Sequence, residues 1–331
     1  MKSSQPLKGM EAVVLAAGLG ERLRPLSLAR PKCLFPVMNR PLLEVCLEWL
    51  AGLGVVRVRL NAHYLMEQVE AWLSRATLPL PVDLSREPSR ILGTGGGIRQ
   101  AARGLSSTFA VVNADCLLRG VDVAAMLAAH REGRALATLL LQEEGSVRNI
   151  TVEGALLTSL RGRPEGAPGA AAGFTGLHLM EPGLISRIPE GVSDIIEVYL
   201  GCLERGERLC GHVSRGHYFC DMGTPASYLG LHRDVFAGRL SLPGAGAGAG
   251  VGAGVDDGLC LAQGVVRGEG CLLGPEVVAG PGVSFGAGCV VRRSILWEGA
   301  SVAPGVEVSG CVVGQGARVV RQATDEVLVA G

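Results

Sequence analysis

The chain has 331 residues and no net charge at pH 7, with 31 basic and 31 acidic side chains. This length allows two domains with separate cores, and no basic stripe with interleaved aromatic residues points to nucleic acid as a partner. No run of eighteen apolar residues occurs, so we expect no membrane span, and the first eight residues lack the apolar core of a signal peptide.

The ten cysteines are scattered and form no C-x-x-C pair. Cys46 and Cys271 stand where a small hydrophobic residue would serve. We therefore predict reduced, buried cysteines in a cytoplasmic protein, and a disulfide or zinc framework is the weaker alternative.

The first predicted element is a buried strand over residues 10–16, which runs into the sequence L-A-A-G-L-G-E-R-L-R-P-L at residues 15–26. A strand that ends in a glycine-rich turn exposes backbone N–H groups. With Arg22 and Lys32 nearby, those groups form a cradle for phosphate. The dinucleotide fingerprint fails because Leu23 occupies its third glycine position, and the G-K-[ST] of the Walker loop is missing. An ordinary strand-to-loop turn is the alternative.

Lys32 is unusual in this composition. Only three lysines occur, at positions 2, 8 and 32, against 28 arginines. The protein uses arginine for general surface charge, so an internal lysine indicates a task for a compact ammonium group on a flexible stem.

The elements that follow alternate between helix and strand. The pattern predicts helices over residues 41–53, 65–73 and 121–131 and strands over residues 55–60, 82–84 and 109–112. This order favours an α/β fold, a doubly wound, mostly parallel, Rossmann-like sheet. Ligands of such sheets gather beyond the carboxyl ends of the strands.

The remainder of the first domain is richer in strands. We predict strands over residues 136–141, 150–152 and 173–179 and a helix over residues 225–236. The Gly-Ala repeat at residues 243–254 is typical of a flexible connector. We therefore divide the chain into a domain over residues 1–240, a linker over 241–258 and a second domain over 259–331.

The second domain carries a six-residue repeat. Apolar residues recur at that interval, with a slip near Gly299, at Val265, Cys271, Val277, Val283, Cys289 and Ile295. This period indicates a β-helix, and the domain resembles the left-handed β-helix of hexapeptide-repeat proteins. Acyltransferases built on such helices use a histidine, and none follows His232. We therefore expect a structural role, with a homo-oligomer formed through the β-helix.

Two aspartates are candidate metal ligands. Asp115 follows the strand at residues 109–112, and Asp221 opens the sequence D-M-G-T-P. Mg²⁺ binds one or two carboxylates together with substrate phosphates. A helix cap or a turn is the alternative role for each.

A run of glycines, G-T-G-G-G at residues 93–97, precedes a helix that we predict over residues 98–105. Glycines at a helix entrance let the backbone approach a flat ligand and offer N–H donors. A flexible loop before a helix is the alternative.

Together these motifs resemble those of sugar-1-phosphate nucleotidylyltransferases, the NDP-sugar pyrophosphorylases. The resemblance rests on residues 15–26 with Pro31-Lys32, the glycine run, N-A-D at residues 113–115, F-T-G-L-H at residues 174–178, D-M-G-T-P and the β-helix. It implies Mg²⁺ on Asp115 and Asp221 and catalytic cations at Arg22 and Lys32. It implies contacts to the nucleotide from Leu15, Ala16, Ala17, Gly18, Gly20, Gly93, Thr94, Gly95 and Gly96, and to the sugar from Asn113, Thr175, Gly176 and Arg163.

The sequence departs from the family pattern at two places. The family's N-G-D is N-A-D here, which is a mild change where φ is negative and a crowded one where φ is positive. The family's E-K-P, whose lysine grips the sugar phosphate, is not found between residues 156 and 173, and Arg163-Pro164 is the nearest substitute.

The resemblance implies a Mg²⁺-dependent transfer of a nucleotidyl group from an NTP to a sugar 1-phosphate. It favours GTP and mannose 1-phosphate. A uridylyltransferase for amino-sugar 1-phosphates and a guanylyltransferase for heptose 1-phosphate are alternatives. A non-catalytic subunit that binds NDP-sugar is an alternative of another class. A glycosyltransferase would have a D-x-D motif, and the first aspartate is missing from N-A-D.

Overall fold

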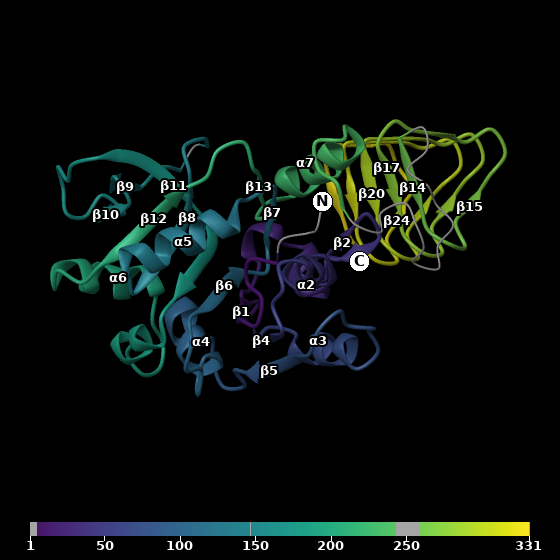
Figure 1. Cartoon of the computed structure of the whole chain (residues 1–331). Coiled ribbons are helices and arrows are strands. Elements are labelled where there is room, and N and C mark those ends of the chain that lie inside the picture. Colours follow the sequence, from purple (N-terminus) through teal and green to yellow (C-terminus); the bar gives the residue numbers. More distant parts are fainter. Residues whose placement is uncertain (1–4, 146, 243–257, 331) are drawn as a thin grey trace. The chain divides into compact units, whose positions relative to one another are not determined.

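The computed structural model describes residues 5–145, 147–242 and 258–330 (Figure 1). Contacts between residues divide the chain into two units. The sheet unit comprises Met1–Leu19 and Cys46–Asp221, and the β-helix unit comprises Gly20–Val45 and Met222–Gly331. Residues 20–45 and 222–240, which we assigned to the first domain, therefore group with the β-helix. Most of the predicted linker lies outside the described residues.

The sheet unit contains a nine-stranded sheet. In sheet order its strands are β5 (Val82–Arg86), β4 (Arg57–Ala62), β1 (Glu11–Leu15), β6 (Phe109–Asn113), β11 (Ala170–Met180), β8 (Ala137–Gln142), β12 (Leu209–Val213), β10 (Leu156–Leu160) and β9 (Ile150–Glu153). The first four strands are parallel, as predicted. β11 runs antiparallel to both of its neighbours β6 and β8, so the second half of the sheet is mixed.

The helices of the sheet unit pack on this sheet. They are the larger part of α2 (Leu42–Gly52), α3 (Met66–Leu73), α4 (Gly93–Ala101), α5 (Val123–Gly133), the short 3-10 helix η3 (Pro182–Arg187) and α6 (Ile195–Glu204). Val13 of β1 and Val111 of β6 lie in one core cluster with Ile98 of α4 and Tyr199 of α6. Side chains alternate along a strand, so Val14 and Val112 point to the opposite face, where they are also fully buried. Burial on both faces is expected of a parallel sheet.

A second, two-stranded sheet matters for the site. It pairs β7 (Cys116–Arg119) with β13 (Tyr218–Asp221) in antiparallel fashion. The sequence did not indicate β7, because its four residues follow β6 after only two intervening residues.

The β-helix unit contains three parallel sheets through which the chain passes in rotation. One sheet has β14 (Leu259–Leu261), β17 (Val277–Ala279), β20 (Ser294–Leu296), β23 (Val312–Val313) and β26 (Val327–Leu328); the second has β15 (Val266–Arg267), β18 (Ser284–Phe285), β21 (Ser301–Val302) and β24 (Arg318–Val319); the third has β16 (Leu272–Leu273), β19 (Val290–Arg292), β22 (Glu307–Ser309) and β25 (Ala323–Thr324). This is the arrangement of a β-helix, and its left-handedness stays a prediction.

The register of these sheets places the slip in the repeat earlier than the predicted position near Gly299. Leu272 pairs with Val290, eighteen residues later, whereas Val277 pairs with Ser294, seventeen residues later. One residue is therefore lost between Val290 and Ser294, and Ser294 rather than Ile295 lies opposite Val277. Cys271, Val277, Val283 and Cys289 are buried, as their six-residue spacing predicts.

The rest of the β-helix unit comes from two other stretches of the chain. Residues 20–45 form η1 (Glu21–Leu23), α1 (Leu26–Ala29), η2 (Lys32–Leu34), β2 (Pro36–Val37), β3 (Arg40–Pro41) and the start of α2. The helix predicted over residues 225–236 is α7 (Pro225–Phe236), which Thr224 and Ser227 cap reciprocally.

The described chain also bears on the predictions for the cysteines and for a membrane span. The ten cysteines, all within the described residues, form no disulfide, and nine of them are buried. Burial raises the pKa of Cys46 to about 12, so its thiol stays protonated and behaves as a small hydrophobic group. Among the described residues, no helix is long and apolar enough to cross a membrane.

Candidate functional site

The two candidate metal ligands come together at the paired strands β7 and β13. Asp221 ends β13 and lies opposite Cys116, which is the residue after Asp115. Strands far apart in the sequence thus bring the backbones of the two aspartates close together beyond β6. The turn that carries Asp115 is fixed by its neighbour, because the Ala114 amide donates to the carbonyl of Leu15 at 2.9 Å.

The alanine in N-A-D fits its backbone. Several non-glycine residues of the described chain adopt positive φ, and Ala114 is not among them. A Cβ at this position is therefore unstrained, and the departure from N-G-D is the mild one.

The two aspartates could hold a divalent metal ion. Their carboxylates are oxygen ligands, and Mg²⁺ is usually bound by one or two carboxylates together with water and substrate phosphates. In the described residues no group of three or more His, Cys, Asp or Glu side chains could hold a metal ion.

A pocket of about 600 Å³ opens beside the end of β1 and the start of α4. Its lining includes apolar side chains and several polar groups. The lining residues are Leu15, Gly93, Thr94, Asn113, Arg161, Phe174, His178, Val192, Ser193, Asp194, Ile195 and Ile196. Four of the predicted ligand-binding residues, Leu15, Gly93, Thr94 and Asn113, therefore share one cavity.

Asp194 is the centre of the polar groups in this pocket. It caps α6 by accepting from the Ile196 amide, accepts from the Thr94 hydroxyl at 3.3 Å, and forms an ion pair with Arg161 at 2.7 Å. Burial acts to raise the pKa of Asp194, but these hydrogen bonds and the Arg161 charge outweigh it and lower the pKa. The carboxylate is therefore ionised at neutral pH.

Ser193 offers a second polar group. Across the described residues, its buried Oγ is one of few side-chain atoms without a hydrogen-bond partner. This Oγ lies against α4, 2.6 Å from the position of a Cβ on Gly95, and an unsatisfied buried hydroxyl costs free energy.

His178 lies in the wall of the pocket but is an interior histidine. Only 1% of its surface is exposed, and its Nδ1 shares a hydrogen bond with the hydroxyl of Tyr199. Burial lowers the pKa of His178 to about 3, so the ring is neutral at physiological pH.

A buried polar network ties the first glycine-rich turn to the start of α4. The Ala16 amide donates to Asn61 Oδ1 at 2.7 Å, Asn61 Nδ2 donates to Glu87 Oε1 at 2.8 Å, and Glu87 Oε2 accepts from the Leu92 amide at 2.9 Å. Asn61 and Glu87 are each 2% exposed. Asn61 does not stand out in the sequence, because it is a single polar residue near the end of a strand, β4.

The other residues of the first glycine-rich turn differ in their surroundings. Leu15 lines the pocket and Ala17 is buried. Gly18 has open space around the position of a Cβ, so the approach of a ligand to its backbone is unhindered.

The glycines at residues 93–97 lie inside α4, which starts at Gly93 rather than at Ile98. The helix therefore starts five residues earlier than predicted, the alternative of a flexible loop is wrong, and packing accounts for three of the glycines. The Gly95 amide donates to the carbonyl oxygen of Ser193 at 2.8 Å. A Cβ on Gly96 would overlap the Gly191 carbonyl. A Cβ on Gly97 would lie 2.6 Å from Asn61 Nδ2. Gly95 and Gly96 are buried against the chain itself.

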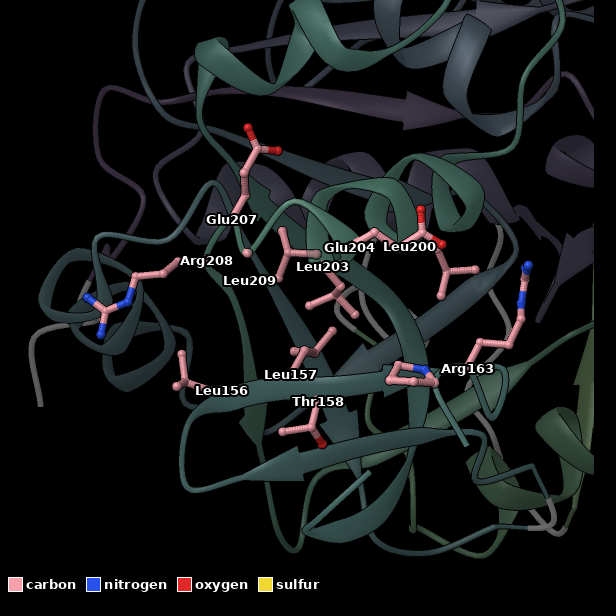
Figure 2. Close-up of a pocket in the computed structure, with 12 residues that line it drawn as sticks. Leu156, Leu157, Thr158, Arg163, Leu200, Leu203, Glu204, Glu207, Arg208 and Leu209 are labelled. Carbon is pink, nitrogen blue, oxygen red and sulfur yellow. The ribbon is translucent and has the colours of Figure 1, made fainter. Parts of the chain in front are cut away.

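Two predicted sugar contacts lie away from the pocket. Thr175 is fully buried and donates to the carbonyl of Leu140 at 3.0 Å, because its side chain points into the sheet. Arg163 pairs with Glu197 at 2.7 Å and lines a different pocket of about 550 Å³. Figure 2 shows leucine side chains that converge on that second pocket. Arg161, two residues earlier, is the arginine in the first pocket.

Gly176 adopts φ +83, and a Cβ there would lie 3.0 Å from Asn113 Nδ2. Only glycine fits this backbone and this approach. The Asn113 side chain therefore packs on the backbone of β11 at the edge of the pocket.

The two candidate catalytic cations belong to the β-helix unit. Gly20 has φ +64 and starts η1, which carries Arg22; its carbonyl accepts from the Ser27 hydroxyl at 2.8 Å. A Cβ on Gly20 would lie 3.7 Å from the Cβ of Lys32, so residues 20 and 32 are close in space. Gly223 leaves room for the Arg22 guanidinium, whose Cζ would be 2.7 Å from a Cβ at that position.

Comparison with known proteins agrees with these features. The family described as nucleotidyl transferase matches residues 11–237. A mannose-1-phosphate guanylyltransferase of Mycobacterium tuberculosis is 34% identical over 318 residues, which are 94% of this chain and 81% of that protein. An N-acetylmuramate alpha-1-phosphate uridylyltransferase of Neisseria meningitidis is 32% identical over 65% of this chain and 94% of its own length.

Solved structures share the fold at lower identity. HddC from Yersinia pseudotuberculosis complexed with GMP-PN has a TM-score of 0.57 at 22% identity, over 68% of this chain and 99% of that chain. An apo UDP-glucose pyrophosphorylase has a TM-score of 0.57 at 16% identity, over 70% of this chain and 99% of that chain. The chain belongs to the nucleotidyl transferase family and is a sugar-1-phosphate nucleotidylyltransferase.

Proposed function

We propose that the enzyme forms GDP-mannose and pyrophosphate from GTP and mannose 1-phosphate. The extent of the similarity to relatives supports this substrate pair. The guanylyltransferase of M. tuberculosis aligns with 94% of the chain, whereas the two N-acetylmuramate uridylyltransferases align with 65% and 66%. The first of these alignments therefore includes most of the β-helix unit.

In the proposed reaction, a phosphate oxygen of the sugar 1-phosphate attacks the α-phosphorus of the NTP. The bond from the α-phosphorus to the bridging oxygen of the β-phosphate breaks, and pyrophosphate leaves. No protein nucleophile is needed, so alignment and charge stabilisation carry the catalysis.

The resemblance to the family supports the following proposed roles. The pocket beside α4 receives ligand through Thr94, Asn113 and the backbone of Gly93, and Arg22 and Lys32 stabilise the charge on the α-phosphoryl group and on pyrophosphate. Mg²⁺ held by Asp115 and Asp221 would neutralise phosphate charge.

Pyrophosphate release across a panel of substrates tests the proposal. Each of GTP, UTP, dTTP, CTP and ATP is combined with the 1-phosphates of mannose, glucose, N-acetylglucosamine, N-acetylmuramate and heptose. We expect strong activity with GTP and mannose 1-phosphate, dependent on Mg²⁺ and reduced at least about 100-fold in Asp115→Asn. The exposed Glu153→Gln is the matched control. A stronger rate with UTP and an amino sugar would contradict the substrate pair and leave the family unchanged.

We also propose that Arg161 contributes to binding of the sugar phosphate. Its side chain is 45% exposed in the pocket, where Asp194 and Glu197 hold it at 2.7 Å and 3.2 Å. Arg163 shares Glu197 but faces the other pocket, so Arg163→Ala is the matched control. We expect Arg161→Ala to raise the KM for sugar 1-phosphate about tenfold with little change for NTP. Equal effects of both substitutions would argue against this role.

Assembly through the β-helix stays a prediction. Val266, Leu272 and Val320 are more than half exposed on this unit, and apolar surface of this kind favours association. Sedimentation of the full chain tests it.

A further inference from the structure

The segment that carries both candidate cations is built on the β-helix. Residues 20–45 interrupt the sheet unit in sequence, yet their contacts place them with Met222–Gly331. We call residues 20–36 the cation segment, because Arg22 and Lys32 lie in it. The contacts within the β-helix unit show what fixes its position.

The first anchor is aromatic. Trp297 follows β20, is 1% exposed, and meets the ring of Phe35 edge to face with 4.7 Å between centroids. Its Nε1 donates to the Tyr228 hydroxyl at 3.2 Å, and that hydroxyl donates to the carbonyl of Pro36 at 2.5 Å. All three aromatic side chains are fully buried, so this end of the segment has a single position.

The second anchor is ionic and lies two residues before Lys32. The Arg30 guanidinium stacks on Trp297, with Cζ 4.7 Å from the ring centroid, and forms an ion pair with Glu298. Arg30 also donates to Gln315 Oε1 at 3.1 Å. The Arg30 side chain is only 16% exposed. A partly desolvated pair that is also stacked on a ring holds its geometry better than an ordinary surface pair.

A third set of contacts fixes the turn beyond the segment. Asn39 Nδ2 donates to the carbonyls of Ala279 and Cys260 at 3.1 Å and 3.3 Å. The Met38 amide donates to His232 Nε2 at 3.2 Å. Both residues adopt positive φ, so the turn has little freedom to shift.

We propose that Trp297 and Glu298 are positioning residues that hold Lys32 and Arg22 in place through Arg30 and Phe35. The inference rests on the proposed function, which gives those cations their role. Cations stabilise developing charge efficiently when they are fixed beforehand, and a displacement of about 1 Å can cost about 100-fold in rate. The β-helix is then part of the catalytic apparatus rather than an appended domain.

Neutral variants of the ion pair test this without removing a core side chain. We expect Arg30→Gln and Glu298→Gln each to lower kcat about tenfold while the KM for NTP changes less than twofold, because most residues predicted to contact the nucleotide belong to the sheet unit. The double variant should be no worse than either single variant. Glu307→Gln is the matched control, since Glu307 pairs with Arg292 within the β-helix at 3.7 Å and should leave kcat unchanged.

A second readout does not depend on activity. The Phe35 amide donates to the carbonyl of Lys32 at 3.0 Å, so its hydrogen exchange reports the order of the segment. We expect faster exchange in Arg30→Gln and Glu298→Gln and no change in Glu307→Gln. If the wild-type enzyme has no transferase activity, the proposed function fails while exchange still tests the positioning. Unchanged kcat and unchanged exchange in both variants, or equal losses in Glu307→Gln, would overturn the proposal.

Discussion

His178 shows how burial sets the chemistry of one residue in the pocket wall. Its pKa is lowered by burial to about 3, whereas an unfolded histidine titrates near 6.5. Between these values the unfolded chain binds a proton that the folded chain does not. The free energy of unfolding therefore falls as the pH drops below about 6.5.

His178→Gln should make that acid dependence shallower. Glutamine keeps a group that can bond to Tyr199 but does not titrate, so one of the protons taken up on unfolding is removed. His232, whose pKa burial lowers to about 4, stays in place and retains its own share. Urea unfolding of the two proteins between pH 7 and pH 4 measures the difference. Parallel curves would mean that His178 does not contribute.

At this scale the sequence singles out residues that belong to a motif and says little about those that act through packing. Asp115 and Asp221 stand out because each lies at the end of a strand in a recognisable context, and the pairing of β7 with β13 places Asp221 opposite the residue after Asp115. Arg161 does not stand out because two arginines two residues apart look alike in a sequence. Only the path of the chain after β10 decides which of them enters the pocket.

Among the elements, α4 differs most from its prediction. Glycines usually weaken a helix, so the sequence predicts that the helix starts after the run at residues 93–97. The structure supplies the missing reason, which is the close approach of Gly191, Ser193 and Asn61 to the helix backbone. Such contacts join parts of the chain up to a hundred residues apart, so a local pattern cannot reveal them. The other predicted helices and the predicted strands of the sheet unit are present because their apolar periodicity is local.

Gly96→Ala should therefore destabilise the protein strongly. An added Cβ would overlap the carbonyl of Gly191, which is backbone and cannot move aside cheaply. We expect a loss of about 1–3 kcal/mol in the free energy of unfolding, together with weaker NTP binding. Gly230→Ala in α7 is the control, because its Cβ would meet nothing within 4 Å. It should be neutral or stabilise by about 0.5–1 kcal/mol. Equal effects would show that the packing around α4 is loose.

For the whole molecule, the β-helix unit should open as one body that includes residues 20–45. Val308 is fully buried in the β-helix core, and Val308→Ala should cost about 1–3 kcal/mol. The Leu42 amide donates to the Phe35 carbonyl. If residues 20–45 unfold together with the β-helix, Val308→Ala should accelerate hydrogen exchange at the Leu42 amide as well as in the β-helix strands. Native-state hydrogen exchange measures this.

Leu139→Ala supplies the comparison, because Leu139 is fully buried in the core of the sheet unit. It should accelerate exchange in β8 and its neighbours more than at Leu42. The opposite pattern, with Leu42 following Leu139→Ala and ignoring Val308→Ala, would assign residues 20–45 to the sheet unit.

The discontinuous membership of the β-helix unit limits how this enzyme can be recombined with its relatives. The chain passes from one unit to the other after Leu19, after Val45 and after Asp221. In a chimera with a single junction at residue 240, Arg30 and Phe35 would come from one parent and residues 297 and 298 from the other. The side chains at this contact would then be mismatched. A chimera that respects these contacts needs three junctions, and its donor fragment must include residues 20–45.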